Sequence, residues 1–323
     1  MRLRRTRPSD PGITRIRRGR GFEYRDPEGG RLRDEDALDR IRALAIPPAW
    51  RDVWICARAN GHLQAVGIDD AGRTQYLYHA DWSRRAAARK FDRALDLAGR
   101  MPAVRRGVTR DLRGEGASRE RVLAGAFRLL DTALLRVGSE RYAQENGTVG
   151  LTTLRGEHVT VDGATVALSF VGKSGEPWER SFEDPDLARL LAELTSRGRD
   201  AQVLSWRDDD GWHPLRSADV NDDLRARTGA DATVKDIRTL RGTTIAARRL
   251  ARWGPESTDA GRTRAVAAAA REAAEALGNT PAVARGSYID PRVIDRYEHG
   301  CVVDDGTIAH VEGQLARLVG AHA

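Results

Sequence analysis

The sequence predicts an α+β protein in which a small antiparallel β-sheet domain is followed by a larger, mainly α-helical domain that contains a β-meander. Between residues 12 and 82, short alternating segments are broken by turn signals such as Asn-Gly, with one helix expected at 34–45. Further along, apolar residues recur at helical spacing. We therefore expect two domains, 1–86 and 87–323, and 323 residues suffice for two cores.

The second domain is expected to begin with a helix at 83–100. The next helix carries an apolar stripe, and we expect it to end at Gly138, which places Arg136 near its C-terminal end. The stripe consists of Leu123, Phe127, Leu130 and Leu134. A three- or four-stranded meander is then expected, drawn from the segments 148–154, 158–163, 165–171 and 178–182, with Lys173 at the tip of its last hairpin.

Helical patterns resume after the meander. Thr233 and Asp236 form a capping pair before one of these helices, and Thr280-Pro281 and Asp290-Pro291 supply an N-cap and a first-turn proline for two short ones. The longer helices are expected at 186–197, 217–227, 233–253 and 258–277, with an amphipathic helix within 306–323.

The charge balance suits a polyanionic partner. The chain has 54 Lys and Arg against 47 Asp and Glu, a formal charge of +7 and a pI near 9.9. Only three of the basic residues are lysines, Lys90, Lys173 and Lys235. An ammonium group can deliver a proton and arginine cannot readily do so, so each lysine is a candidate for a task that needs lysine.

Several classes of function are not supported by the sequence. The two cysteines have no CxxC or Cys/His spacing, so neither a disulfide framework nor a zinc site is expected. A Gly-Lys-Ser triplet occurs, but Ala167 stands where a Walker loop needs glycine, so ATP use is not expected. We expect no metal, no cofactor and no membrane span, and a cytoplasmic location.

The remaining candidates form an ordered set along the chain: an arginine near a helix end, a lysine on a hairpin, a Lys-x-x-Arg pair, an asparagine after a helix stop, and Tyr288 nine residues later. Each has an ordinary structural explanation when it is taken singly. An arginine can complement a helix dipole, a lysine on a turn is solvated, and a tyrosine in a late helix usually packs in a core.

Taken together, five stretches resemble the type IB DNA topoisomerases of the poxvirus-like and bacterial branch over nearly the whole chain. These stretches are NGHLQAVGIDDAGRTQYLYH, LLRVGSERYAQENGTVGLTTLRGEHV, FVGKSG, VKDIRTLRGTT and EALGNTPAVARGSYIDP. The resemblance implies the fold shared by tyrosine recombinases and topoisomerase IB, with a DNA-binding domain at 1–86 and a catalytic domain at 87–323. It also implies a monomer that clamps double-stranded DNA of the nucleoid and relaxes positive and negative supercoils without ATP or metal.

The resemblance assigns chemistry to the ordered set. Tyr288 would attack a phosphodiester and form a 3'-phosphotyrosyl bond, while Arg136 and Arg238 would clamp phosphate oxygens. Lys173 would protonate the leaving 5' oxygen. Asn279 stands where poxviral members carry histidine, and its amide can donate a neutral hydrogen bond but cannot transfer a proton.

Other residues are expected to bind DNA. By resemblance these are Gln75, Tyr76, Tyr78, Tyr142 and Lys235, and Lys235 is also a candidate second proton donor. We expect Tyr76 and Tyr78 to point to opposite faces of their strand. Tyr297 and Tyr142 are rival nucleophiles. Tyr142 is assigned to DNA binding by the resemblance, and the spacing of Tyr297 from Val293 and Ile294 is typical of core packing.

Two alternative functions stay open at this point. A tyrosine recombinase would use the same catalytic logic, although recombinases usually carry His-x-x-Arg where this chain has Lys235 and Arg238, and a helical domain where this chain has a sheet. A non-enzymatic DNA-binding protein of the same fold is the other alternative, although it would have no reason to keep the complete set.

Overall fold

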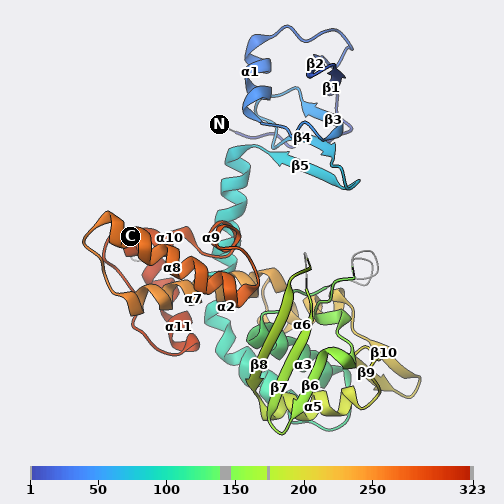
Figure 1. Cartoon of the computed structure of the whole chain (residues 1–323), viewed down its shortest axis with the longest axis vertical. Helices are drawn as coiled ribbons and strands as arrows, with labels where there is room; N and C mark the ends of the chain where they lie inside the picture. The colour runs from blue at the N-terminus through green and yellow to red at the C-terminus, as the bar shows by residue number, and fades with distance from the viewer. Residues whose placement is uncertain (1, 139–146, 173–174, 321–323) are drawn as a thin grey trace. The chain divides into compact units, whose positions relative to one another are not determined.

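The computed structural model describes residues 2–138, 147–172 and 175–320. The chain divides into two compact units, Met1–Arg89 and Lys90–Ala323, and each is described by itself. The helix α2 (Ala80–Leu112) belongs to both, because it begins in the smaller unit and ends in the larger one (Figure 1).

The smaller unit is built on a five-stranded antiparallel sheet in the order β2-β1-β3-β4-β5, with α1 (Glu35–Ala43) beside it. The side chain of Asp34 caps α1 by accepting hydrogen bonds from the backbone N–H groups of residues 36 and 37. Helix α1 lies within the range predicted for a helix, 34–45. Ile13, Ile41 and Ile55 form the centre of its core. The strands are β1 (Gly12–Arg18), β2 (Gly21–Arg25), β3 (Arg51–Cys56), β4 (Leu63–Ile68) and β5 (Thr74–Tyr78).

Strand β5 corrects one expectation. Tyr76 and Tyr78 lie on the same face, where both are exposed and their rings stack with centroids 6.3 Å apart. Gln75 and Leu77 point to the other face and are half-buried. The prediction of opposite faces was wrong, because side chains alternate along a strand and residues two apart therefore share a face.

The larger unit contains the expected helices, with two corrections at helix ends. Helix α2 runs twelve residues past the predicted end at 100 and continues through Pro102, because a buried row that includes Leu97, Met101 and Val108 packs on both sides of the proline. The helices after α2 are α3 (Arg119–Ala133), α5 (Pro185–Thr195), α6 (Ser217–Thr228), α7 (Val234–Trp253), α8 (Asp259–Leu277), α9 (Pro281–Ser287), α10 (Pro291–Glu298) and α11 (Ile308–Gly320).

The second correction concerns α3. Its predicted stripe from Leu123 to Leu134 is buried, but the helix ends at Ala133 rather than at Gly138. Leu134 adopts the left-handed conformation with φ of 56°, which stops the helix. Arg136 therefore lies beyond the helix and not in its last turn.

The predicted meander is a three-stranded antiparallel sheet, β6 (Val159–Asp162), β7 (Thr165–Val171) and β8 (Pro177–Glu183), and α5 packs against β6 and β7 (Figure 1). The segment 148–154 is not a strand but contains a 3-10 turn, Leu151–Thr153. A separate hairpin of β9 (Ser205–Asp208) and β10 (Gly211–Pro214) was not predicted. The fold class predicted from the sequence is confirmed.

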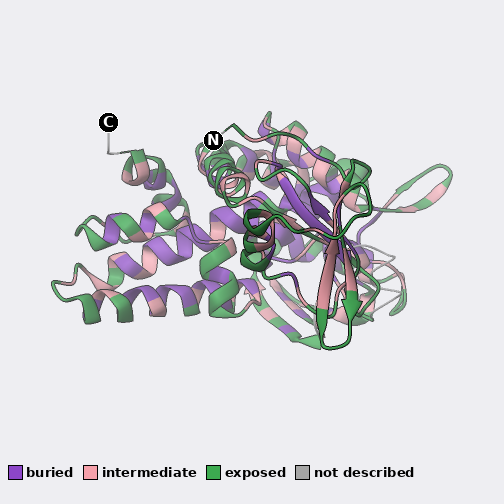
Figure 2. Ribbon diagram, turned by 90° about the horizontal axis from the view of Figure 1, so that it is seen from above, coloured by how far each residue is buried: buried purple, intermediate pink, exposed green. Residues whose placement is uncertain are grey.

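The core of the larger unit runs between the helices and this sheet, and buried residues concentrate on the inward helix faces (Figure 2). Helix α7 is central to it: it packs against α8 and α11, and its buried face includes Ile237, Leu240, Thr244 and Ala247. Within the described part of the chain, no helix is long and apolar enough to cross a lipid bilayer.

Candidate active site

The end of α3 brings Arg136 to the site. The left-handed Leu134 turns the chain away from the helix axis and aims its carbonyl oxygen at the guanidinium of Arg238, which donates to it through Nη1. Two residues later, Nη2 of Arg136 donates to the carbonyl oxygen of Gly278 at 2.9 Å and to Oδ1 of Asn279 at 2.7 Å. Arg136 is thus held by the turn that follows α8.

Arg238 lies in the first turns of α7 and is almost completely buried, with 3 % of its surface exposed. Besides Leu134, it donates from Nη2 to the carbonyl oxygen of Leu277 at 2.7 Å, while its Nε has no partner among the described residues. Burial lowers the pKa of Arg238 to about 10, which leaves it protonated at neutral pH. Its charge is therefore fixed in place, and its Nε–H is left without an acceptor in the described part of the chain.

The turn after α8 positions Asn279. Gly278 ends the helix with φ of 58°, and a Cβ at this position would lie 2.2 Å from the ring of Trp178 on β8, so only glycine fits. Because Arg136 holds Oδ1 of Asn279, the other end of the amide, Nδ2, is directed elsewhere; it is buried and has no partner among the described residues. A buried N–H donor without an acceptor is costly, which marks this atom as available for a ligand.

Tyr288 caps the C-terminus of α9, a helix that begins at the predicted Thr280-Pro281 pair. Its carbonyl oxygen accepts a hydrogen bond from the hydroxyl of Thr243 at 3.1 Å, and the preceding carbonyl, that of Ser287, accepts from Nζ of Lys90 at 2.8 Å. Gly242 lets α7 approach this backbone, since a Cβ there would lie 2.8 Å from the Tyr288 carbonyl oxygen.

Tyr288 shares a hollow with two arginines and a lysine. The Arg238 Cζ lies 5.3 Å from the centroid of the Tyr288 ring. Arg136, Lys235, Arg238 and Tyr288 line one hollow of about 590 Å³, and the described residues around it include no acidic side chain. Burial lowers the pKa of Arg136, and proximity to Tyr288 acts in the opposite direction. The hollow therefore presents positive charge and neutral donors beside a phenol, a combination that suits a phosphate diester.

The structure thus brings together five of the ten residues predicted for function: Arg136, Lys235, Arg238, Asn279 and Tyr288. Lys173 and Tyr142 lie outside the described residues. Gln75, Tyr76 and Tyr78 belong to the smaller unit, where Nε2 of Gln75 donates to Asp69 at 2.8 Å.

The rival nucleophile Tyr297 packs in the core with 1 % of its surface exposed, and its hydroxyl donates to the carbonyl oxygen of Gly254 at 2.8 Å. Burial raises the pKa of Tyr297. This tyrosine is therefore anchored, and its phenol is poorly suited to nucleophilic attack.

Three residues that hold the Tyr288 backbone were not predicted to take part: Gly242, Thr243 and Lys90. The sequence offered a signal for Lys90, as one of three lysines among many arginines, while Gly242 and Thr243 lie in the stretch VKDIRTLRGTT that carries the resemblance. The Lys90 ammonium group also lies 4.1 Å from the centroid of the Phe91 ring. The part that Gly242 and Thr243 play could not be read from that stretch, because it depends on α7 meeting the end of α9. No cluster of three potential metal ligands occurs in the described part of the chain.

Comparisons with known proteins agree with this geometry. The family model of the eukaryotic DNA topoisomerase I catalytic core matches residues 80–302, and that of the bacterial DNA topoisomerase IB N-terminal domain matches residues 21–69. The first of these alone covers more than half of the chain. The chain belongs to the type IB DNA topoisomerase family.

Individual relatives support the same assignment. DNA topoisomerase 1B of Acanthamoeba polyphaga mimivirus is 28% identical over 296 residues, which cover 89% of this chain and 88% of the viral protein. DNA topoisomerase 1B of Vaccinia virus (strain Copenhagen) is 28% identical over 148 residues, 43% of this chain and 46% of that protein. DNA topoisomerase 1 of Schizosaccharomyces pombe is 33% identical over 105 residues, 32% of this chain and 13% of that protein.

Type IB topoisomerases are isomerases that act on DNA, and the match to the bacterial N-terminal domain places this chain in the bacterial branch of the family. The resemblance predicted from the sequence is confirmed at this level. The residues around Tyr288 all fall inside the range matched by the catalytic-core model, and β5 falls between the two matched ranges.

Proposed function

We propose that the protein relaxes positive and negative supercoils in duplex DNA by transient cleavage of one strand, acting as a monomer on chromosomal DNA. One observation carries the proposal: two guanidinium groups share a hollow with the phenol of Tyr288, and one of them holds Asn279, whose buried amide nitrogen has no partner among the described residues. Cleavage of a phosphodiester needs a nucleophile and donors for the charge that develops on the phosphoryl oxygens, and this hollow offers both.

In the proposed reaction, the Tyr288 oxygen attacks the phosphorus, and the phenolic proton leaves to water. A bond forms between the tyrosine and the 3' phosphate while the bond from phosphorus to the 5' oxygen breaks. Arg136, Arg238 and Asn279 donate to the non-bridging oxygens. The ester conserves the energy of the broken bond, so the 5' hydroxyl can reverse the step without ATP, and no step calls for a metal ion.

Lys173 is the proposed general acid for the departing 5' oxygen, and Lys235 is assigned to DNA binding. Lys173→Ala should cleave ordinary DNA slowly, because an unprotonated alkoxide is a poor leaving group. The same variant should recover cleavage on DNA with a 5'-bridging phosphorothiolate, whose thiolate leaves without a proton. Single-turnover assays measure the cleavage rate on both substrates. Equal impairment on both would contradict the general-acid role of Lys173.

Gln75, Tyr76 and Tyr78 of the β-rich domain are proposed to bind DNA. Tyr142 of the catalytic domain is proposed to bind it as well. The exposed, stacked pair on β5 supports this most directly, because two large aromatic rings on one exposed face can contact base edges or sugars. With a domain boundary at 86, the two domains would close around the duplex as a clamp.

The test is relaxation of a supercoiled plasmid by the purified full chain in EDTA without ATP. We expect stepwise relaxation of both supercoil signs and a covalent adduct when the reaction is stopped with detergent. Tyr288→Phe should bind DNA but form no adduct. Tyr297→Phe is the matched control, and it should keep the activity while losing one hydrogen bond, worth about 1 kcal/mol of stability. An adduct formed by Tyr288→Phe would disprove the nucleophile assignment.

A further inference from the structure

The first residues of the chain lie in the smaller unit as an ordered segment against the turn between β3 and β4. The backbone of Arg4 donates to the Asn60 carbonyl at 2.9 Å and accepts from the N–H of His62 at 2.8 Å. Asn60 Nδ2 donates to the carbonyl oxygen of Arg2 at 3.2 Å. Thr6 is buried and donates from its hydroxyl to the Leu63 carbonyl at 3.1 Å. Residues 2–6 are therefore fixed to the sheet domain.

Gly61 makes this close fit feasible. A Cβ at this position would lie 2.5 Å from the sulfur of Cys56 and 3.2 Å from the side chain of Thr6. The segment 2–6 and the turn thus form one surface whose backbone is defined on both sides. The backbone positions from which side chains project are therefore held in place, unlike those of a loose tail.

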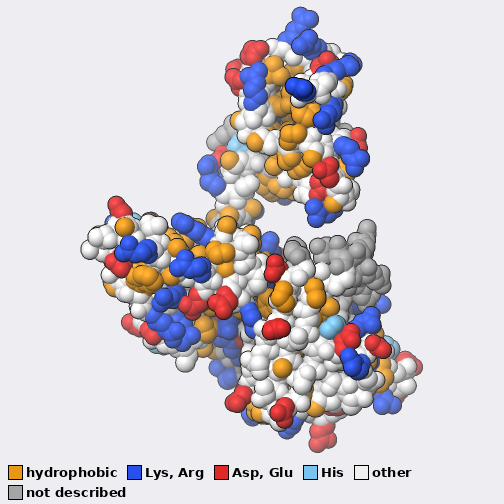
Figure 3. All heavy atoms as spheres, viewed as in Figure 1, with side chains coloured by type: hydrophobic (Ala, Val, Ile, Leu, Met, Phe, Trp, Pro, Cys, Tyr) orange, Lys and Arg blue, Asp and Glu red, His pale blue; other side chains and the backbone are white. Residues whose placement is uncertain are grey.

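Four arginines project from this surface around a hollow of about 700 Å³: Arg2, Arg4 and Arg5 from the segment, and Arg58 from the turn. All four are exposed, and none forms an ion pair or a side-chain hydrogen bond with any residue in the described ranges. Other arginine side chains also lie on the surface of this unit (Figure 3). We call these four residues the arginine quartet.

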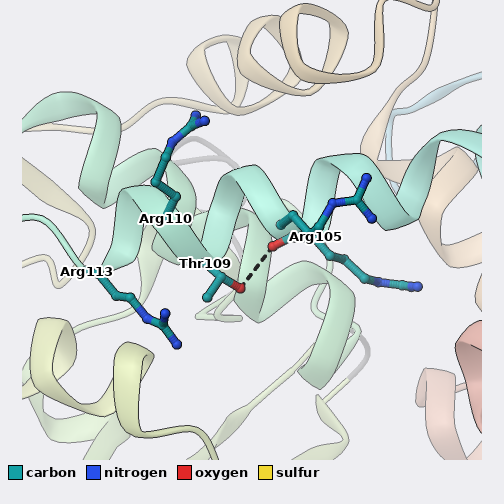
Figure 4. Close-up of a pocket in the computed structure, with 5 residues that line it drawn as sticks. Arg105, Thr109, Arg110 and Arg113 are labelled. Atoms are coloured by element: carbon teal, nitrogen blue, oxygen red, sulfur yellow. Dashed lines mark hydrogen bonds between the residues drawn. The ribbon is translucent and has the colours of Figure 1, made fainter.

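A second hollow lined by arginines differs from the arginine quartet in how its charges are paired. It lies on α2 and is lined by Arg105, Arg106, Thr109, Arg110 and Arg113, whose labelled side chains point in different directions (Figure 4). Three of its arginines already have acidic partners: Arg105 pairs with Asp131 and Glu312, Arg110 with Asp111, and Arg113 with Asp186. That hollow has little free charge for a ligand, whereas the arginine quartet keeps all of its charge.

The arginine quartet is continuous with the aromatic pair on β5. His62, which is hydrogen-bonded to the N-terminal segment through the Thr6 N–H at 3.1 Å, has its ring 6.2 Å from the ring of Tyr78 and 4.6 Å from that of Trp82. Tyr78 in turn stacks on Tyr76. Within the smaller unit, an unpaired cationic surface therefore adjoins exposed aromatic rings.

We propose that the arginine quartet is a phosphate-contacting extension of the DNA-binding surface, which grips the backbone of the duplex beside the Tyr76–Tyr78 pair. The inference rests on the proposed function. Guanidinium forks match phosphate oxygens, and their contacts fix position without reading sequence. Residues 2–5 lie before the range matched by the bacterial N-terminal model, which begins at residue 21, whereas Arg58 lies within it.

The test is the salt dependence of duplex binding, measured in a Tyr288→Phe background so that no cleavage intervenes. The triple variant Arg4→Gln, Arg5→Gln, Arg58→Gln should bind more weakly at low salt. Its slope of log K against log salt should be shallower by about 0.9 for each phosphate that the variant no longer neutralises, up to about 2.7. The probe is a blunt 30-base-pair duplex.

The matched control is the triple variant Arg106→Gln, Arg264→Gln, Arg271→Gln, which removes the same charge from exposed arginines that have no partner among the described residues. Its slope should stay near that of the parent. Equal slope changes in both triples would mean that only net charge matters and would overturn the inference, as would an unchanged slope in the first triple. Plasmid relaxation by the chain with Tyr288 intact is scored separately, so failure of the proposed function would leave this result readable.

Discussion

Asn279 shows how one side chain can be oriented by its neighbour. Its Oδ1 accepts from Arg136 at 2.7 Å, and this leaves the buried Nδ2 as the end of the amide without a partner among the described residues. The same contact uses one nitrogen of Arg136, so the remaining N–H groups of that fork are the ones free for phosphate. Arg136 and Asn279 should therefore act as a unit.

Asn279→Asp tests this orientation at nearly constant volume. The carboxylate can still accept from Arg136, but its second oxygen would face the phosphate as an acceptor with negative charge. We expect the single-turnover cleavage rate to fall by about 10²- to 10³-fold, the usual loss for one transition-state donor, with duplex binding changed much less. Asn279→His, which restores an N–H donor, should retain most of the rate. Cleavage by Asn279→Asp at the parent rate would show that Nδ2 does not touch the phosphate.

At the scale of elements, the sequence predicted those whose signals are local. The caps at Thr233, Thr280 and Asp290 start α7, α9 and α10 as expected. The errors occur where tertiary packing overrides a local signal. Pro102 does not end α2. Helix α3 ends at the left-handed Leu134 rather than at Gly138, and the Leu134 carbonyl oxygen accepts a hydrogen bond from Arg238, a residue 104 positions away.

The same reasoning explains which parts of the site could be predicted. The residues that would touch phosphate belong to short motifs, so Arg136, Arg238, Asn279 and Tyr288 could be named before the structure. The groups that hold them could not, because Lys90 and Ser287 are 197 positions apart and only the fold makes them neighbours. The unexpected hairpin of β9 and β10 lies away from these motifs and alters none of them.

Helix α7 and the Tyr288 backbone form an element-scale contact that can be tested through Gly242. A methyl group at this position would lie 2.8 Å from the Tyr288 carbonyl oxygen and 3.0 Å from the Tyr288 Cβ, so Gly242→Ala should displace the proposed nucleophile. A shift on the order of 1 Å costs about 10²-fold in rate, and we expect a loss of that size in single-turnover cleavage with normal duplex binding.

Gly99→Ala in α2 is the control for this change, because nothing lies within 4 Å of a Cβ there. An alanine in an unhindered helix interior usually stabilises by about 1 kcal/mol, so this variant should gain stability and keep its cleavage rate. If Gly242→Ala behaved in the same way, the contact with Tyr288 would not position the nucleophile.

At the scale of the larger unit, four helices are joined by a buried charge network. Arg105 of α2 pairs with Asp131 of α3 at 2.7 Å and with Glu312 of α11 at 2.7 Å, and Arg241 of α7 lies 3.5 Å from Glu312. Glu312 is 2 % exposed. The network fixes α11, which lies beyond the range matched by the catalytic-core model, to the helix that carries Arg238.

Glu312→Ala should therefore be strongly destabilising. Removing one partner leaves Arg105 and Arg241 to share Asp131, and breaking a buried ion pair typically costs about 3 kcal/mol or more. We expect the free energy of unfolding from urea titration to fall by about that amount. Glu115→Ala removes an exposed carboxylate with no ion pair among the described residues, and it should change the free energy by less than about 0.5 kcal/mol. If the two variants proved equally stable, α11 would be held by its apolar face, including Val311 and Leu315, and the charges would add little.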